Sequence, residues 1–347
     1  MTDRRHSFVV ATVAVMAAAM CGVSRAQDAA LIAAAKKEGE VVWYTGLVVN
    51  QVVRPLMEAF EKKYGIPVKM TSVGMQAELV LKVTNEMRSG RPAADVIEGG
   101  GQMIPPLVAA GAIERYTPPS AANYAPEFKS KDGYWTVSSV NYVTAAINTD
   151  QIKPDDAPRT YQNLLDPKWR GKMVWSADLN NAGAPGFIGN ILMSMGEGPG
   201  MAYLKALVGQ KVTPLTVNQR VVLDQVIAGQ YPLALTTFYH HGVISRAQGA
   251  PVQWIPLEPV IAVGNVSALV KNAPHPNAAR LFLDFLLSDE GQTVFRDASY
   301  IPAHPSIASK LPPLKPGGEK FKLLLISPEM SAEHLPNWTK IYTELFQ

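Results

Sequence analysis

Strand-like and helix-like segments alternate between residues 29 and 110, and this alternation constrains the fold more than any other feature. Short apolar runs alternate with segments whose apolar residues recur at helical spacing. The predicted strands are Glu40–Tyr44, Ile66–Thr71 and Ala94–Ile97, and the predicted helices are Ala29–Glu38, Asn50–Tyr64, Ala77–Ser89 and Gln102–Ala110. This order of strands and helices predicts an α/β fold with a parallel sheet covered by helices.

The carboxyl ends of the predicted strands indicate where a ligand would bind, because open α/β sheets bind ligands outside that edge. Thr45 and Gly46 follow the first strand, and Glu98 and Gly100 follow the third. The glycine run at 99–101 fits either a tight turn or a backbone-amide site for an anion. These segments are therefore expected to share one rim of the sheet.

Two long β-rich stretches, Val137–Thr149 and Ile255–Val270, lie far apart in the chain. They bracket further predicted strands and helices, namely Lys172–Ser176, Ala182–Ser194, Ala202–Val208, Arg220–Ala228 and Leu233–Thr237. An amphipathic helix is predicted over Pro276–Gln292. The arrangement predicts two lobes joined by two crossing strands, with residues 27–140 and 262–347 in lobe 1 and residues 141–261 in lobe 2. The prediction leaves open whether the C-terminal helices contact one lobe or both.

The first 26 residues read as a secretory signal peptide. Arg4, Arg5 and His6 form a basic start, and Phe8–Met20 is almost wholly apolar. Small residues at Ser24 and Ala26 fit a cleavage site after Ala26. The apolar run is shorter than the roughly 20 residues that a membrane-spanning helix needs. The chain is therefore expected to be exported to the periplasm.

Cys21 is the single cysteine of the chain and leaves one alternative for processing, cleavage as a lipoprotein. Met20 is bulky where such cleavage prefers a small residue, so removal of residues 1–26 is favoured. That removal takes the cysteine away and leaves 29 basic and 28 acidic residues. A nearly neutral surface argues against a nucleic-acid partner, and the lack of a thiol excludes disulfide chemistry.

Motifs that would support catalysis are missing. The sequence contains no G-x-S-x-G, no H-E-x-x-H and no Walker loop. His240 and His241 are adjacent, and neighbours in a strand point to opposite faces. A secreted hydrolase with a histidine base stays as a remote alternative, for which no nucleophile or metal cluster is found. The chain is therefore predicted not to be an enzyme and to need no cofactor.

Four segments, residues 41–69, 94–116, 166–187 and 275–295, together resemble the periplasmic solute-binding proteins of ABC importers. The similarity is to the group that includes ferric-iron, thiamine, sugar-phosphate and phosphonate receptors. It includes the run PLMEAFEKKYGIPV at residues 55–68 and DPKWRGKMVW at residues 166–175. The resemblance implies a type II periplasmic-binding fold, in which a monomer captures its ligand between two lobes and delivers it to an inner-membrane ABC permease.

The resemblance also implies a possible ferric site, since iron receptors of this group use two adjacent tyrosines, often with a histidine and a glutamate. Tyr239 matches the first tyrosine, but His240 replaces the second. Val48 stands near the position of the histidine and Gly100 at that of the glutamate, with Glu98 two residues earlier. Tyr239, His240 and Glu98 are thus the residues of a metal-binding alternative.

The other matched positions favour an organic anion. Asn181 and Gly183 lie at a predicted helix start, where backbone N–H groups and the helix dipole attract phosphate or carboxylate. Arg220 follows Asn218 at another helix start and can grip an oxyanion with two hydrogen bonds. The predicted ligand is a small carboxylate, phosphate ester or phosphonate. The candidate ligand-binding residues are Thr45, Gly46, Glu98, Gly100, Asn181, Gly183, Asn218, Arg220, Thr237, Tyr239 and His240.

Overall fold

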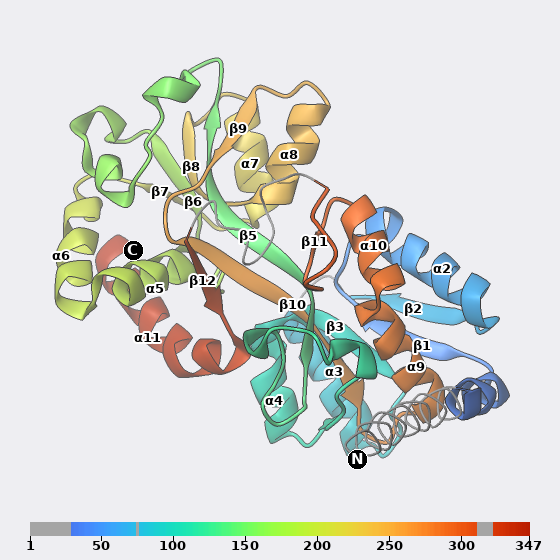
Figure 1. The fold of residues 1–347 in the computed structure, drawn as a ribbon. Coiled ribbons are helices and arrows are strands. Elements are labelled where there is room, and N and C mark those ends of the chain that lie inside the picture. Colours follow the sequence, from blue (N-terminus) through green and yellow to red (C-terminus); the bar gives the residue numbers. More distant parts are fainter. Residues whose placement is uncertain (1–28, 74–75, 311–321) are drawn as a thin grey trace, which may run out of the picture.

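A computed structural model describes residues 29–73, 76–310 and 322–347 of the chain. The predicted signal peptide and Cys21 lie outside the described residues. In these ranges twelve strands form one sheet, whose main order is β2-β1-β3-β10-β5-β8-β6-β7. Helices pack on its faces, and the two ends of the sheet form two lobes (Figure 1).

The first lobe is built on β1 (Val41–Thr45), β2 (Val68–Ser72) and β3 (Val96–Gly100), which pair in parallel. A helix over 29–38 precedes β1, and a helical turn at Val49–Val53 leads into α2 (Arg54–Tyr64). The helices α3 (Gln76–Arg88) and α4 (Ile104–Ala109) follow β2 and β3, and the short strand β4 (Ile113–Glu114) pairs with β10. The predicted β-α-β-α-β order is therefore confirmed.

The two long stretches form β5 (Thr136–Asn148) and β10 (Val260–Val270), which pair antiparallel in the middle of the sheet. Val137 and Val140 of β5 belong to an apolar core of the first lobe, whereas Ala145 and Ile147 belong to a core of the second. Each strand thus runs from one lobe into the other, between the two groups of helices in Figure 1.

The second lobe contains the parallel strands β6 (Met173–Ser176), β7 (Thr213–Leu215) and β8 (Leu233–Phe238). Its helices are α5 (Ala184–Met195), α6 (Glu197–Val208), α7 (Gln219–Ile227) and α8 (Tyr239–Ala247). Trp175 of β6 contacts Phe187 of α5 edge-to-face in the core, with ring centroids 5.7 Å apart. Burial of such large rings against the sheet holds the helices on it.

Two predicted elements differ in detail. The stretch expected over Ile255–Val270 is interrupted, because β9 (Val252–Ile255) ends before Pro256 and β10 begins after Pro259, and proline has no N–H to donate to a sheet. The helix expected over Pro276–Gln292 is two helices, α9 (Pro276–Leu287) and α10 (Asp289–Asp297). Ser288 separates them, since its hydroxyl accepts from the Gly291 N–H as a new N-cap.

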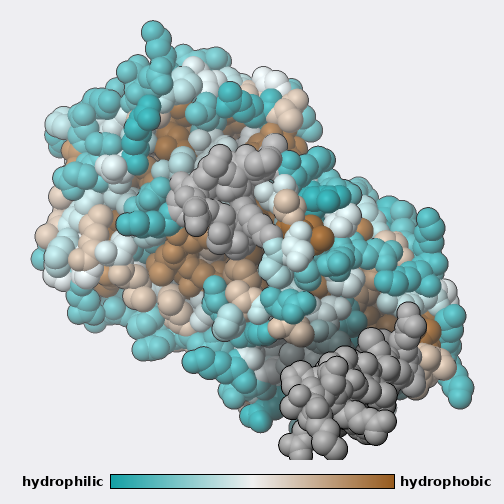
Figure 2. Space-filling view, in the orientation of Figure 1, coloured by the Kyte–Doolittle hydropathy of each residue, from teal (hydrophilic) through white to brown (hydrophobic). Residues whose placement is uncertain are grey.

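The chain ends with β11 (Ile301–Pro302), β12 (Leu323–Ile326) and α11 (Pro328–Phe346). Figure 2 shows hydrophobic residues gathered over β12, where residues 323–325 are only partly buried. Helix α11 packs on α5 and α6 of the second lobe and also touches α4 of the first. The predicted boundaries between the lobes, at residues 140/141 and 261/262, stay predictions. Helix α11 contacts both lobes. Within the described ranges, no helix combines the length and apolar character needed to cross a membrane.

Replacing Gly189 with alanine is expected to lower the free energy of unfolding by about 2 kcal/mol, because overpacking a filled interior costs that much. A Cβ at Gly189 of α5 would lie 2.5 Å from the ring of Trp338 in α11. Gly198 of α6 is the matched control, since its Cβ would meet nothing within 4 Å. Gly198→Ala should stabilise by about 0.5 kcal/mol. Urea unfolding that finds both variants equally stable would contradict this packing of α11.

Candidate ligand-binding cleft

A cavity of about 320 Å³ opens between the lobes, at the carboxyl ends of β1 and β8. The loop after β1 and Tyr300 line it from the first lobe, and the starts of α7 and α8 line it from the second. Asn141 of β5 and Asn265 of β10 also line it. The lining residues are Gly46, Leu47, Val48, Asn141, Asn218, Gln219, Arg220, Phe238, His240, His241, Asn265 and Tyr300. The cavity occupies the rim expected from the order of strands.

A second cavity of about 140 Å³ continues from the first and shares four lining residues with it: Asn141, Gln219, Phe238 and Asn265. We call it the carboxamide pocket, because seven of its lining residues are asparagine or glutamine. They are Gln76, Gln102, Asn141, Asn180, Asn181, Gln219 and Asn265. Gly100, Ala182, Val263 and Gly264 complete the wall with Phe238. The larger cavity and the carboxamide pocket form one cleft.

Arg220 supplies a positive charge to the cleft from the first turn of α7. Asn218 caps this helix, since its Oδ1 accepts from the backbone N–H groups of Arg220 and Val221. The guanidinium donates from Nη2 to Asp224 Oδ1 at 2.6 Å and from Nη1 to Ser245 Oγ at 2.9 Å. Its side chain stays 41% exposed, so it can turn from this surface ion pair to an arriving anion at little cost.

His240 and His241 lie beside Arg220 as neutral side chains. Burial, and then the charges of His241 and Arg220, lower the pKa of His240 well below its usual value. Burial and Arg220 lower the pKa of His241 to about 4. The His240 ring stacks on Phe238 and Tyr300, with centroid distances of 5.6 and 5.4 Å. At neutral pH these rings therefore offer hydrogen bonds and stacking surface rather than charge.

The two histidines lie in a helix, beyond the strand predicted over Leu233–Thr237. Strand β8 ends at Phe238, and α8 begins at Tyr239. Successive residues of a helix turn by about 100° rather than by the 180° of a strand. The rings of His240 and His241 consequently meet, with centroids 4.2 Å apart, and both line the cavity.

Six of the eleven predicted site residues line the cleft, namely Gly46, Gly100, Asn181, Asn218, Arg220 and His240. Thr45 and Thr237 instead fix the backbone next to it. The Thr45 hydroxyl accepts from the Leu47 N–H at 3.1 Å, and the Thr237 hydroxyl donates to the Thr144 carbonyl at 3.0 Å. Gly183 is the N-cap of α5, and a Cβ there would lie 2.1 Å from the Asp178 carbonyl oxygen. Contact of any of these residues with a ligand stays a prediction.

Glu98 lies in β3 beneath the cleft and is fully buried. Burial raises the pKa of its carboxyl to about 8, and the nearby Ser138 hydroxyl offsets only part of that shift. Ser138 also lies 3.2 Å from the Asn265 carbonyl. The Ser138 hydroxyl carries one proton, so it can donate to Glu98 Oε1 or to the Asn265 carbonyl but not to both at once. Glu98 thus fits a protonated structural residue at neutral pH.

Tyr239 points into the core rather than into the cavity. It is 4% exposed and contacts the Trp254 ring edge-to-face at 4.9 Å. Burial raises the pKa of its phenol, which opposes the phenolate that ferric iron prefers. The structure therefore does not gather Tyr239, His240 and Glu98 around one point of the cleft. Within the described part of the chain, no three His, Cys, Asp or Glu side chains are grouped to hold a metal.

Asn141, Asn265, Gln219 and Tyr300 line the cleft but were not predicted. Asn141 and Asn265 each interrupt a long apolar β-run, and a polar side chain inside such a run is a usable signal for a site. Gln219 stands between the predicted Asn218 and Arg220. Tyr300 carries no comparable signal, because the turn after α10 brings it to the cleft.

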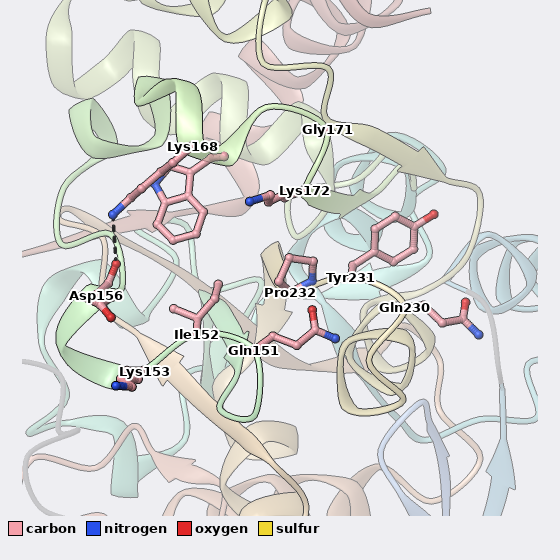
Figure 3. A pocket seen from close by; sticks show the side chains of 11 residues that line it. Gln151, Ile152, Lys153, Asp156, Lys168, Gly171, Lys172, Gln230, Tyr231 and Pro232 are labelled. Carbon is pink, nitrogen blue, oxygen red and sulfur yellow. Dashed lines mark hydrogen bonds between the residues drawn. The ribbon is translucent and has the colours of Figure 1, made fainter.

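A wider hollow of about 790 Å³ lies elsewhere on the second lobe (Figure 3). Lys172 precedes β6 and Pro232 precedes β8, so this hollow is at the amino ends of the strands. Lys153, Lys168 and Asp156 surround it, and Lys168 donates to the Asp156 carbonyl at 3.3 Å. Parallel α/β sheets bind ligands at the opposite edge, which favours the cleft between the lobes as the site.

Comparison with known proteins places the chain in a family. Residues 91–322 match the family model for bacterial extracellular solute-binding proteins. Iron uptake protein A1 of Synechocystis sp. is 25% identical over 209 residues, which cover 53% of this chain and 56% of that protein. The chain thus matches little more than half the length of that relative. A putative 2-aminoethylphosphonate-binding periplasmic protein of Salmonella typhimurium is 23% identical over 83% of this chain and 82% of its own length.

Solved structures share the fold. Iron-bound HitA from Pseudomonas aeruginosa superimposes with a TM-score of 0.71 at 22% identity, over 87% of this chain and 98% of that one. AfuA from Actinobacillus pleuropneumoniae, with exogenous fructose-6-phosphate bound, gives a TM-score of 0.69 at 20% identity, over 89% and 98%. The predicted α/β periplasmic-binding fold is confirmed, and the family is one of receptors rather than enzymes. The chain belongs to the bacterial extracellular solute-binding proteins.

Proposed function

We propose that this receptor captures a small organic anion, a carboxylate, phosphate ester or phosphonate, and delivers it to an inner-membrane ABC permease. One observation carries the proposal. Of the described residues that line the cleft, Arg220 is the one with a full charge at neutral pH, and none is acidic, since Asp224, which pairs with Arg220, does not line it. A positive charge in a cleft with no lining carboxylate favours an anion over a cation.

The two crossing strands suggest how capture works. Gly46 and Tyr300 line the cavity from one lobe, and Arg220 and His240 line it from the other. A ligand that bridges both sets of groups stabilises whichever arrangement brings them together, so it favours closure about β5 and β10. The closed receptor would then present the shape that the permease recognises. No bond is made or broken in the ligand.

Thermal unfolding with a panel of organic carboxylates, phosphate esters and phosphonates tests this function. A ligand at 100 times its Kd stabilises the folded state by about 2.7 kcal/mol. For a chain of this size that is a rise in Tm of about 5 °C. The expected result is such a rise with at least one class of anion. No rise with any of them, and no compaction in small-angle scattering, would contradict the proposal.

A ferric receptor is the second candidate, favoured by the iron proteins among the relatives. Its iron would be held by Tyr239 with a synergistic anion, with His240 or Glu98 as further ligands. Tyr239 would have to leave its packing against Trp254 to reach the cleft. Loading with ferric citrate would then give a phenolate-to-iron charge-transfer band that Tyr239→Phe abolishes. A protein that stays colourless after loading would exclude this candidate.

A further inference from the structure

We propose that the carboxamide pocket holds uncharged hydroxyl groups of the ligand, so that the receptor selects hydroxylated organic anions over alkyl or amino analogues. The inference rests on the proposed function, because it places the anionic group at Arg220. The larger cavity and the carboxamide pocket share Asn141 and Gln219, so one small molecule can occupy both. The pocket itself has room for a group of a few heavy atoms at about 140 Å³.

The lining of the pocket argues against a charged group. None of the described residues that line it carries a charge. An ammonium group offers donors only, and its burial without a carboxylate would be costly. A second carboxylate would likewise lack a cation there. Hydroxyls both donate and accept, as carboxamides do, and they carry no charge to compensate.

Buried polar atoms that lack partners give the second observation. Asn181 and Gln219 are 5% and 4% exposed, and no group in the described residues bonds Asn181 Oδ1 or Gln219 Nε2. Gln76 Oε1 and Asn141 Oδ1 are also buried without a described partner. If the oxygen and nitrogen of an amide are interchanged, the other atom becomes the unpaired one. In either assignment the unpaired amide atoms of the pocket need both donors and acceptors from a ligand. Hydroxyls supply both, whereas an alkyl group would leave these atoms unpaired at a cost.

Three probes with one phosphate and a three-carbon chain isolate the pocket: glycerol 3-phosphate, n-propyl phosphate and 3-aminopropyl phosphate. We expect calorimetry to show glycerol 3-phosphate binding at least tenfold more tightly than either of the others, since sites built to bond a hydroxyl reject analogues without it. Gluconate against hexanoate repeats the comparison with a carboxylate. Equal affinities within both sets, or tighter binding of the amine, would overturn the inference.

Gln102→Met tests the pocket directly, because it removes the amide of a partly exposed lining residue and nearly conserves its volume. The ratio of the Kd values of propyl phosphate and glycerol 3-phosphate should fall severalfold towards one. Arg220→Gln should weaken both phosphates and leave that ratio as it is. If neither Gln102→Met nor Gln76→Met changes this ratio of Kd values, the proposed role of the pocket is contradicted. If none of the anions binds the wild-type protein, the proposed function fails rather than the selectivity.

Discussion

Replacing Arg220 with glutamine is expected to weaken binding of the organic anion by about 100-fold. Truncating one member of a charge-assisted hydrogen-bonded pair costs about 3 kcal/mol, and each 1.4 kcal/mol is a factor of ten. The loss should appear in calorimetry as a higher Kd for every anion that the wild-type protein binds. Arg220 also bonds Asp224 and Ser245, so the Tm without ligand must be measured alongside.

Two variants separate ligand binding from a merely structural role of Arg220. Arg246→Gln is the matched control, because Arg246 lies in the last turn of α8, bonds Gln253 and does not line the cleft. It should leave the Kd as it is. Asp224→Asn removes the acid that competes for the guanidinium and should tighten anion binding severalfold. If Arg220→Gln lowers the Tm but not the affinity, Arg220 only joins α7 to α8.

Glu98→Gln is expected to raise the free energy of unfolding by roughly 3 kcal/mol at pH 7 and to have little effect near pH 4.5. The carboxyl has a pKa of about 8 in the folded protein against 4.5 as its ordinary value. Between these values the folded state holds one proton more than the unfolded state, so wild-type stability falls as pH rises through this window. Each pKa unit corresponds to about 1.4 kcal/mol. Glutamine stays neutral and removes this decline.

Urea unfolding of both proteins at pH 5, 7 and 8.5 measures the effect as a difference, in which other titrating groups cancel. Ser138→Ala provides a comparison in the opposite direction. It removes the hydroxyl that lowers the pKa of Glu98, so the decline should continue to higher pH and be larger in total. A constant difference between wild type and Glu98→Gln across this range would show that Glu98 is ionised in the fold.

The order of strands and helices was predictable because apolar runs such as VVWYT in β1 and the helical spacing in α2 are local signals. The two crossing strands, β5 and β10, were predicted from the length of their β-rich stretches. Helix α11 was not predicted, since Pro336 lies inside it and a proline usually ends a helical pattern. Its packing on Trp175 through Tyr342 and Phe346 depends on tertiary contacts that no local pattern reveals.

The sequence predicted the site residues whose position is set by the start of a helix. It did not predict those whose position depends on the direction in which a side chain points. Asn218 and Arg220 follow from the N-cap of α7, and both line the cleft. Tyr239 and His240 stand at the junction of β8 and α8. If that strand ended one residue earlier or later, a different side chain would face the cavity. In the structure His240 lines the cavity, and Tyr239 does not.

Native mass spectrometry of the wild-type protein, incubated with an equimolar mixture of organic carboxylates, phosphate esters and phosphonates, tests the central claim most directly. Anion capture by the cleft predicts a one-to-one complex with an anion from the mixture, and a much weaker complex for Arg220→Gln. The claim would be contradicted by a protein that retains none of these anions yet gains the mass of iron after loading with ferric citrate.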